Sequence, residues 1–123
     1  MILVDTSVWI AYWQEASSVK NLQENLMAKR ILGHEWVFGE MMVGNLGPQR
    51  NRLLADYLKL PRGELYPISQ LYDFVEKHNL KGSGASLIDI QLLYACVVET
   101  HVLWTLDRVL NRLAKRFSLS FID

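Results

Sequence analysis

Short apolar runs recur along the chain, and stretches of helical periodicity separate them. The first run covers residues 1–4, ends at Asp5 and indicates a buried strand. Similar runs predict further strands at residues 35–38, 65–68, 101–105 and 119–122. Strands that alternate with helices are typical of an α/β domain with a mainly parallel sheet.

Apolar side chains spaced three or four residues apart predict the helices between these strands. One face of the first helix combines Val8, Trp9, Tyr12 and Trp13. A second helix is expected over residues 17–32, where Gly33 ends it. Its inward-facing residues are Val19, Leu22, Leu26 and Met27. Another helical stretch opens at Gly39 and Glu40, and further helices are expected over residues 49–60, 70–78, 86–100 and 107–117.

The chain is long enough to form one domain with its own core. It has 123 residues, of which 50% are hydrophobic, and the commonest domains have about 100–150 residues. No internal repeat, low-complexity tract or linker divides the sequence. We therefore expect a single domain over residues 1–123, and the composition excludes a disordered chain or a disulfide scaffold.

The single cysteine and the N-terminal sequence favour the reducing cytoplasm, and the histidines show no sign of a metal site. The single cysteine, Cys96, lies in an apolar helical stretch, so we expect a buried thiol. No basic stretch precedes the first apolar run, so no signal peptide is expected, and no apolar run approaches the ~18 residues of a membrane span. The histidines lack metal-ligand spacing, and we expect surface or structural roles for His34, His78 and His101.

Four acidic residues stand in apolar surroundings: Asp5, Glu40, Asp89 and Asp107. Asp5, Glu40 and Asp107 fall where a predicted strand ends and a helix begins, and such points share one edge of a parallel sheet. Asp89 lies in the first turn of its helix, which could face the same edge. We therefore expect the four carboxylates to gather at one edge of the sheet.

These carboxylates have a structural and a chemical explanation. An Asp before a helix is a good N-cap, and residues 86–89 match a capping box. A cluster of carboxylates, by contrast, repels itself unless cations neutralise it, and oxygen ligands favour Mg²⁺ or Mn²⁺. Such ions activate a water and stabilise the leaving oxygen in phosphodiester cleavage. From the residues alone, both explanations stay open.

The charge balance points to a local surplus of positive charge. Thirteen basic and thirteen acidic residues give a formal net charge of zero. If the four acids hold metal ions, nine acids remain against thirteen basic residues, a surplus of +4. Two basic groups either hold a phosphate backbone or form solvated helix faces. They are Arg50, Arg52, Lys59 and Arg62, and Arg108, Arg112, Lys115 and Arg116.

Four short motifs follow one another in a recognisable order. They are Val4-Asp5-Thr6-Ser7, Glu40 after the second predicted strand, Ser86-Leu87-Ile88-Asp89, and Thr105-Leu106-Asp107. In their order, and in the size of the whole chain, they resemble the PIN-domain ribonucleases, most closely the VapC toxins of toxin–antitoxin pairs. The resemblance implies a Rossmann-like three-layer sandwich, in which helices flank a parallel sheet of about five strands in the order 3-2-1-4-5.

The resemblance also implies a site and an activity. Asp5, Glu40 and Asp89 would be the catalytic metal ligands, with Asp107 as the fourth catalytic and metal-binding acid. The hydroxyls that orient these carboxylates would be those of Ser7 and Thr105. The implied activity is that of a Mg²⁺- or Mn²⁺-dependent endoribonuclease, the toxin of a type II toxin–antitoxin system. Its implied partners are an RNA substrate, a second copy in a homodimer, and a VapB-type antitoxin.

Other function classes remain as alternatives. A receiver-type signalling module shares the sheet class, but it needs an acidic pair after the first strand and an Asp at the third, whereas Thr6 follows Asp5 and residues 65–68 contain no Asp. A binding protein could keep the fold without chemistry, because fold alone does not decide function. The aromatic residues of the first helix either pack in the core or form an interface: Trp9, Tyr12 and Trp13.

Overall fold

The strand β1 (Ile2–Val4) is the centre of the sheet in the computed structural model, which describes residues 1–121. It pairs in parallel with β2 (Ile31–Leu32) on one side and with β3 (Val102–Trp104) on the other. Isolated parallel bridges extend the sheet at both edges, at Arg62 beside Gly33 and at Ser120 beside Leu103. The order β2-β1-β3 agrees with the expected order at its three central positions, and each outer position carries a single bridge.

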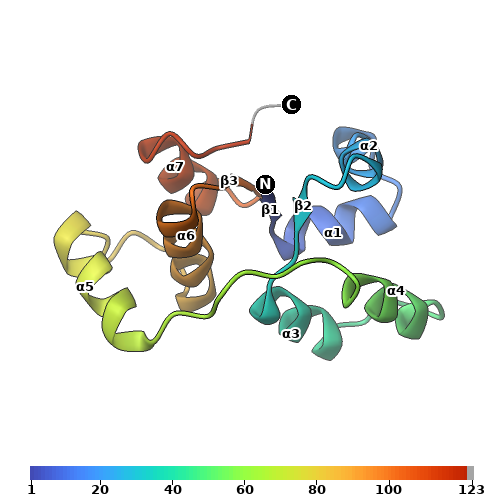
Figure 1. The fold of residues 1–123 in the computed structure, drawn as a ribbon, viewed down its shortest axis with the longest axis horizontal. Helices are drawn as coiled ribbons and strands as arrows, with labels where there is room; N and C mark the ends of the chain where they lie inside the picture. The colour runs from blue at the N-terminus through green and yellow to red at the C-terminus, as the bar shows by residue number, and fades with distance from the viewer. Residues whose placement is uncertain (122–123) are drawn as a thin grey trace.

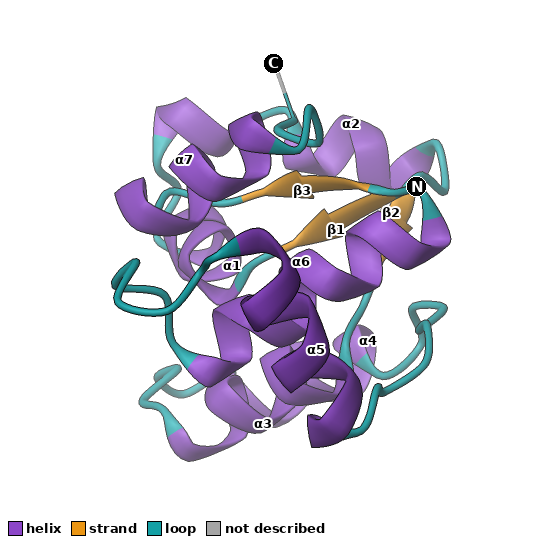
Figure 2. Cartoon of the chain, turned by 90° about the vertical axis from the view of Figure 1, so that its left-hand side faces the viewer, coloured by secondary structure: helices purple, strands orange, loops and turns teal. Residues whose placement is uncertain are grey.

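Helices cover both faces of this sheet (Figures 1 and 2). Within residues 1–121 they are α1 (Thr6–Trp13), a 3-10 turn (Ser17–Val19), α2 (Leu22–Met27), α3 (Glu35–Val43), α4 (Arg50–Tyr57), α5 (Ile68–His78), α6 (Leu87–Glu99) and α7 (Arg108–Arg116). Helices α1 and α2 lie on one side of the sheet, and α6 and α7 pack on β3 from the other. Helices α3 and α4 pack together beyond the end of β2, and α5 packs on α6. None of these helices is long and apolar enough to cross a membrane.

The helix predicted over residues 17–32 ends earlier than expected. Helix α2 stops because Lys29 takes the left-handed conformation (φ +58°) and the backbone N–H of Arg30 donates to the carbonyl of Asn25 at 3.0 Å. This hydrogen bond is typical of a Schellman helix end. The next two residues, which the periodicity placed in the helix, pair with β1 as β2. Met27, predicted to face inward, is 77% exposed.

The strand predicted at residues 35–38 is wrong, because α3 begins at Glu35. The imidazole Nδ1 of His34 accepts the backbone N–H of Trp36 at 3.0 Å and so caps this helix. The strand lies four residues earlier, at Ile31–Leu32. Glu40 therefore sits in the second turn of α3 and not where a strand ends.

The strand predicted at residues 65–68 is also wrong. The side-chain amide of Gln91, which is fully buried on α6, takes the place of a neighbouring strand. Its Oε1 accepts the backbone N–H of Tyr66 at 2.9 Å, and its Nε2 donates to the carbonyl of Tyr66 at 3.1 Å. Both backbone groups of Tyr66 are satisfied without a β-ladder.

The last predicted strand, at residues 119–122, is reduced to the bridge at Ser120. Around that bridge, Leu103 donates to the carbonyl of Leu119 at 2.7 Å and accepts from the N–H of Phe121 at 2.9 Å. Ile122 lies outside the described residues. The edge of the sheet thus has one residue in parallel register in place of a full strand.

Candidate active site

Asp5 follows β1 directly and is buried, with 6% of its surface exposed. Its Oδ1 accepts the backbone N–H of Thr6 at 2.7 Å. Its Oδ2 accepts the hydroxyls of Ser7 at 3.0 Å and Thr105 at 2.7 Å. An ionised carboxylate offers acceptors only, so three donors fit the ionised form and fix its orientation.

The two hydroxyls connect Asp5 to the start of α7. The backbone N–H of Leu106 donates to Ser7 Oγ at 3.0 Å, and that of Asp107 donates to Thr105 Oγ1 at 3.0 Å. Each hydroxyl therefore accepts a backbone proton on one side and gives its own proton to Asp5 on the other. Segments about 100 positions apart in the sequence meet at this carboxylate.

Thr6 brings Glu40 to the same place. Its hydroxyl donates to Glu40 Oε1 at 2.7 Å, while its backbone N–H donates to Asp5. One residue at the start of α1 thus holds carboxylates from β1 and from α3. The sequence analysis missed this role of Thr6, and its position directly after Asp5 in the first motif was the available signal.

Asp89 lies in the first turn of α6 and completes the predicted capping box with Ser86. Its Oδ2 accepts the N–H of Ser86 at 3.0 Å, and its own N–H donates to Ser86 Oγ at 3.1 Å. Partial burial raises the pKa of Asp89, the hydrogen bonds from Ser86 oppose this rise, and the charges of Asp5 and Asp107 add to it. The charges of Asp5 and Asp107 thus disfavour the ionised form of Asp89, with burial as the larger cause.

Asp107 is the N-cap of α7 and is exposed. Its Oδ1 accepts the backbone N–H of Leu110 at 2.8 Å. The capping explanation is thus confirmed for Asp5, Asp89 and Asp107, each of which accepts an N–H at the start of a helix. It does not apply to Glu40, which lies inside α3.

Capping leaves most of the acceptor capacity of Asp107 unused. A carboxylate offers about four lone-pair sites, and Asp107 uses one of them in the cap described above. All-oxygen donors that repel one another fit the chemistry of a hard divalent cation. Within residues 1–121, however, no three acidic, histidine or cysteine side chains stand close enough to hold a metal ion as a group. The donor type fits such an ion, and binding would require the side chains to draw together.

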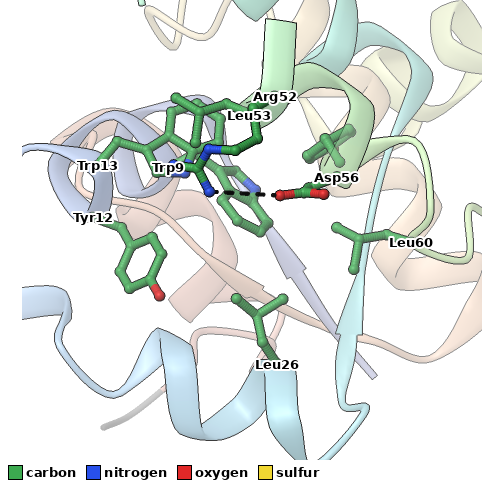
Figure 3. Close-up of a pocket in the computed structure, with 9 residues that line it drawn as sticks. Trp9, Tyr12, Trp13, Leu26, Arg52, Leu53, Asp56 and Leu60 are labelled. Atoms are coloured by element: carbon green, nitrogen blue, oxygen red, sulfur yellow. Dashed lines mark ion pairs between the residues drawn. The ribbon is translucent and has the colours of Figure 1, made fainter. Parts of the chain in front are cut away.

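A separate apolar cavity of about 300 Å³ lies between α1, α2 and α4 (Figure 3). Trp9, Tyr12 and Trp13 line it, and the ion pair between Arg52 and Asp56 stands among its other lining residues. Trp9 is 4% exposed and belongs to the core, whereas Tyr12 and Trp13 are partly exposed. All three rings of the first helix thus line the cavity, and Trp9 also belongs to the core.

The remaining singled-out residues have structural surroundings. Cys96 is fully buried, and burial raises the pKa of its thiol to about 12. His34 is 2% exposed, and burial lowers its pKa to about 4, so it caps α3 as a neutral ring. His78 packs against Phe117, and His101 Nε2 lies 3.2 Å from Glu99 Oε1. The expectation that the thiol is buried is confirmed.

Comparison with known proteins supports the fold alone. No family profile matches the sequence, and no curated protein matches it. The structure is similar to the crystal structure of PAE2754 from Pyrobaculum aerophilum, a PIN-domain protein, with a TM-score of 0.62 and 16% identity. The match covers 98% of this chain and 87% of that one. At this identity the likeness concerns architecture, which is that of a PIN-like α/β fold.

Proposed function

We propose that the chain is a Mg²⁺- or Mn²⁺-dependent endoribonuclease. The observation that carries the proposal is the hydrogen-bond network that ties Asp5 to Glu40 through Thr6 and to the N-cap Asp107 through Thr105. Burial raises the pKa of Asp89 on α6, and the charges of Asp5 and Asp107 add to this rise. Helix capping alone does not require such mutual approach.

In this proposal each residue has a distinct role. Asp5, Glu40 and Asp89 would hold the ion, and Asp107 would be the fourth acid. When bound, the ion would supply Lewis-acid activation of a water for attack on an RNA phosphodiester. The hydroxyls of Ser7 and Thr105 keep the buried Asp5 carboxylate in one orientation, and Thr6 does the same for Glu40.

We also propose the partners that the motif resemblance implies: a VapB-type antitoxin that holds this toxin in check, and a second copy of the chain. The cavity beside Tyr12 and Trp13 is a place where a side chain of a protein partner would bind, since aromatic residues are enriched at interfaces. Light scattering after size exclusion tests the dimer, because one chain has a mass of 14.2 kDa. A mass of one chain at all concentrations would contradict it.

A non-catalytic α/β binding or signalling module is the second candidate. The observation in its favour is that Asp5, Asp89 and Asp107 each cap a helix, a role that needs no ion. Calorimetric titration with Mn²⁺ separates the two candidates. Binding that Asp89→Asn weakens supports the nuclease, and a folded protein that binds no divalent ion supports the module.

The experiment that tests the activity is incubation of the purified protein with total RNA in Mg²⁺ or Mn²⁺. We expect discrete fragments that disappear when EDTA removes the ion. Fragments of equal intensity in EDTA would show that a different chemistry, or a contaminant, cleaves the RNA.

A further inference from the structure

The two basic groups of the sequence differ in how their charges are balanced. In the first group, Arg52 and Lys59 both pair with Asp56, at 4.0 and 3.4 Å. Arg62 of that group pairs with Glu35 at 4.0 Å, and Arg50 donates to the carbonyl of Met42 at 2.7 Å. In the part of the chain that the structure describes, no cation of the second group takes part in an ion pair. Its positive charge is therefore available to an external anion.

The second group lies along one face of α7. Its members recur at positions i, i+4, i+7 and i+8, which share a face of an α-helix, and all of them are exposed: Arg108, Arg112, Lys115 and Arg116. The opposite face buries Leu110, Leu113 and Ala114 in the core. We call the exposed face the α7 basic stripe. At 1.5 Å per residue it is about 12 Å long.

Two of these side chains are held in place without being neutralised. Arg112 Nη2 donates to the carbonyl of Ser83 at 3.1 Å, and Arg116 Nη2 donates to the carbonyl of His78 at 2.7 Å. A guanidinium has five donors, so most remain free for a ligand in each case. The carbonyls carry no net charge, so these contacts orient the cations and leave the charge of the stripe intact.

The stripe begins at the acidic site. Arg108 directly follows Asp107, the N-cap of α7, and the N–H of Asp107 reaches Asp5 through the hydroxyl of Thr105. A ligand that lies along the stripe therefore reaches Asp107 at the N-terminal end of α7. The first basic group does not share this connection, since Arg52 and Asp56 lie with α1 residues around the apolar cavity (Figure 3).

We propose that the α7 basic stripe binds the sugar-phosphate backbone of RNA and leads the chain to the acidic site. This inference rests on the proposed nuclease function and names the surface that holds its substrate. Charge complementarity favours a polyanion. Among the described residues, the large apolar side chains that are exposed include none on α7, whereas the cores of protein interfaces are apolar. An RNA backbone therefore fits the stripe better than an acidic protein does.

The test is the affinity for a labelled single-stranded RNA of about 16 nucleotides, measured by fluorescence anisotropy at several salt concentrations. EDTA is present, so that binding is separated from ion-dependent cleavage. The variant Arg108→Gln/Lys115→Gln removes two stripe cations whose side chains make no hydrogen bond or ion pair within residues 1–121. The control Arg52→Gln/Lys59→Gln removes the same charge from the first basic group.

The stripe variant is expected to bind about tenfold more weakly, with the slope of log K against log salt reduced by about 1.4, while the control stays near the wild-type protein. Equal losses in both variants would overturn the proposal, because net charge alone would explain them. Polyglutamate that displaces the RNA at equal charge would also overturn it in favour of an acidic protein. RNA binding that depends on the stripe, without any cleavage, would contradict the nuclease function and support the stripe. Cleavage at the wild-type rate by the stripe variant would support the nuclease function and contradict the stripe.

Discussion

Thr6 shows how much of the candidate site depends on a single small side chain. Its hydroxyl holds Glu40 and its backbone N–H holds Asp5, so it sets the relative position of two acids from different elements. The acids themselves could be identified from the sequence, because a carboxylate in an apolar run is conspicuous. For Thr6 the signal was weaker: it belongs to the first motif, but a threonine next to Asp5 is also an ordinary first residue of a helix.

Replacing Thr6 by valine tests this position. Valine keeps the shape and removes the hydroxyl, so Glu40 loses its hydrogen bond. We expect the Mn²⁺ affinity in calorimetry and the rate of RNA cleavage to fall by about 10- to 100-fold. Thr6→Ser keeps the hydroxyl and should stay close to the wild-type protein. A Thr6→Val protein with unchanged affinity and rate would show that Glu40 needs no support.

Asp89 tests the cost of an ionised carboxylate that is half-buried and close to other negative charges. The pKa of Asp89 in the folded protein lies above the ordinary 3.8. The ionised carboxylate therefore lowers the stability of the fold at a pH above this raised pKa. The loss fades at lower pH, where Asp89 is protonated in both the folded and the unfolded protein. Asp89→Asn keeps the acceptor of the capping box, so it should raise the Tm at pH 7 by a few degrees, a modest gain because solvent screens a half-buried charge. The gain should shrink as the pH falls toward about 4.

The control for Asp89→Asn is Asp73→Asn on α5, an exposed acid outside the site. Its Tm should stay within the small range typical of surface substitutions. If Asp89→Asn is no more stable than the wild-type protein at pH 7, the ionised Asp89 carboxylate carries no such cost in the folded protein.

At the scale of elements, the successes and failures of prediction have clear causes. Helices α5, α6 and α7 were predicted within two residues at each end, because their apolar stripes and caps are local signals. Helix α2 ends where Lys29 takes the left-handed conformation. Lysine rarely adopts this conformation, so the sequence does not indicate the end of the helix. The false strand at residues 65–68 fails because its partner is the side chain of Gln91, which no local pattern reveals.

The cap of α3 gives a pH prediction. The pKa of His34 falls from 6.5 to about 4 on folding, so folding favours the neutral ring. The stability from this residue is fully present above pH 6.5 and is lost as the pH falls toward 4, by about 3 kcal/mol at most. His34→Asn keeps a capping acceptor but cannot titrate. Urea unfolding should therefore show a smaller loss of stability between pH 7 and pH 4 in this variant, and equal losses would contradict the assignment.

At the scale of the whole molecule, the arrangement places three helix N-termini around a group of acids. Helices α1, α6 and α7 each begin at one of them, and the partial positive charge of a helix N-terminus stabilises a carboxylate. This architecture could be predicted, since a parallel sheet carries the ends of its strands to one edge. Glu40 reached that edge for a reason the sequence did not show, namely through a helix that begins directly after β2.

The central claim is that these acids cleave RNA, and the most direct test compares two isosteric variants of the whole protein. Asp5→Asn removes the charge of the buried acid, and Asp73→Asn removes one charge at an exposed position on α5. Circular dichroism first confirms that both variants are folded, and the rate of fragment formation is then measured with Mn²⁺. We predict that Asp5→Asn is at least about 100-fold slower, while Asp73→Asn matches the wild-type protein. A folded Asp5→Asn protein that cleaves RNA at the wild-type rate would contradict the account.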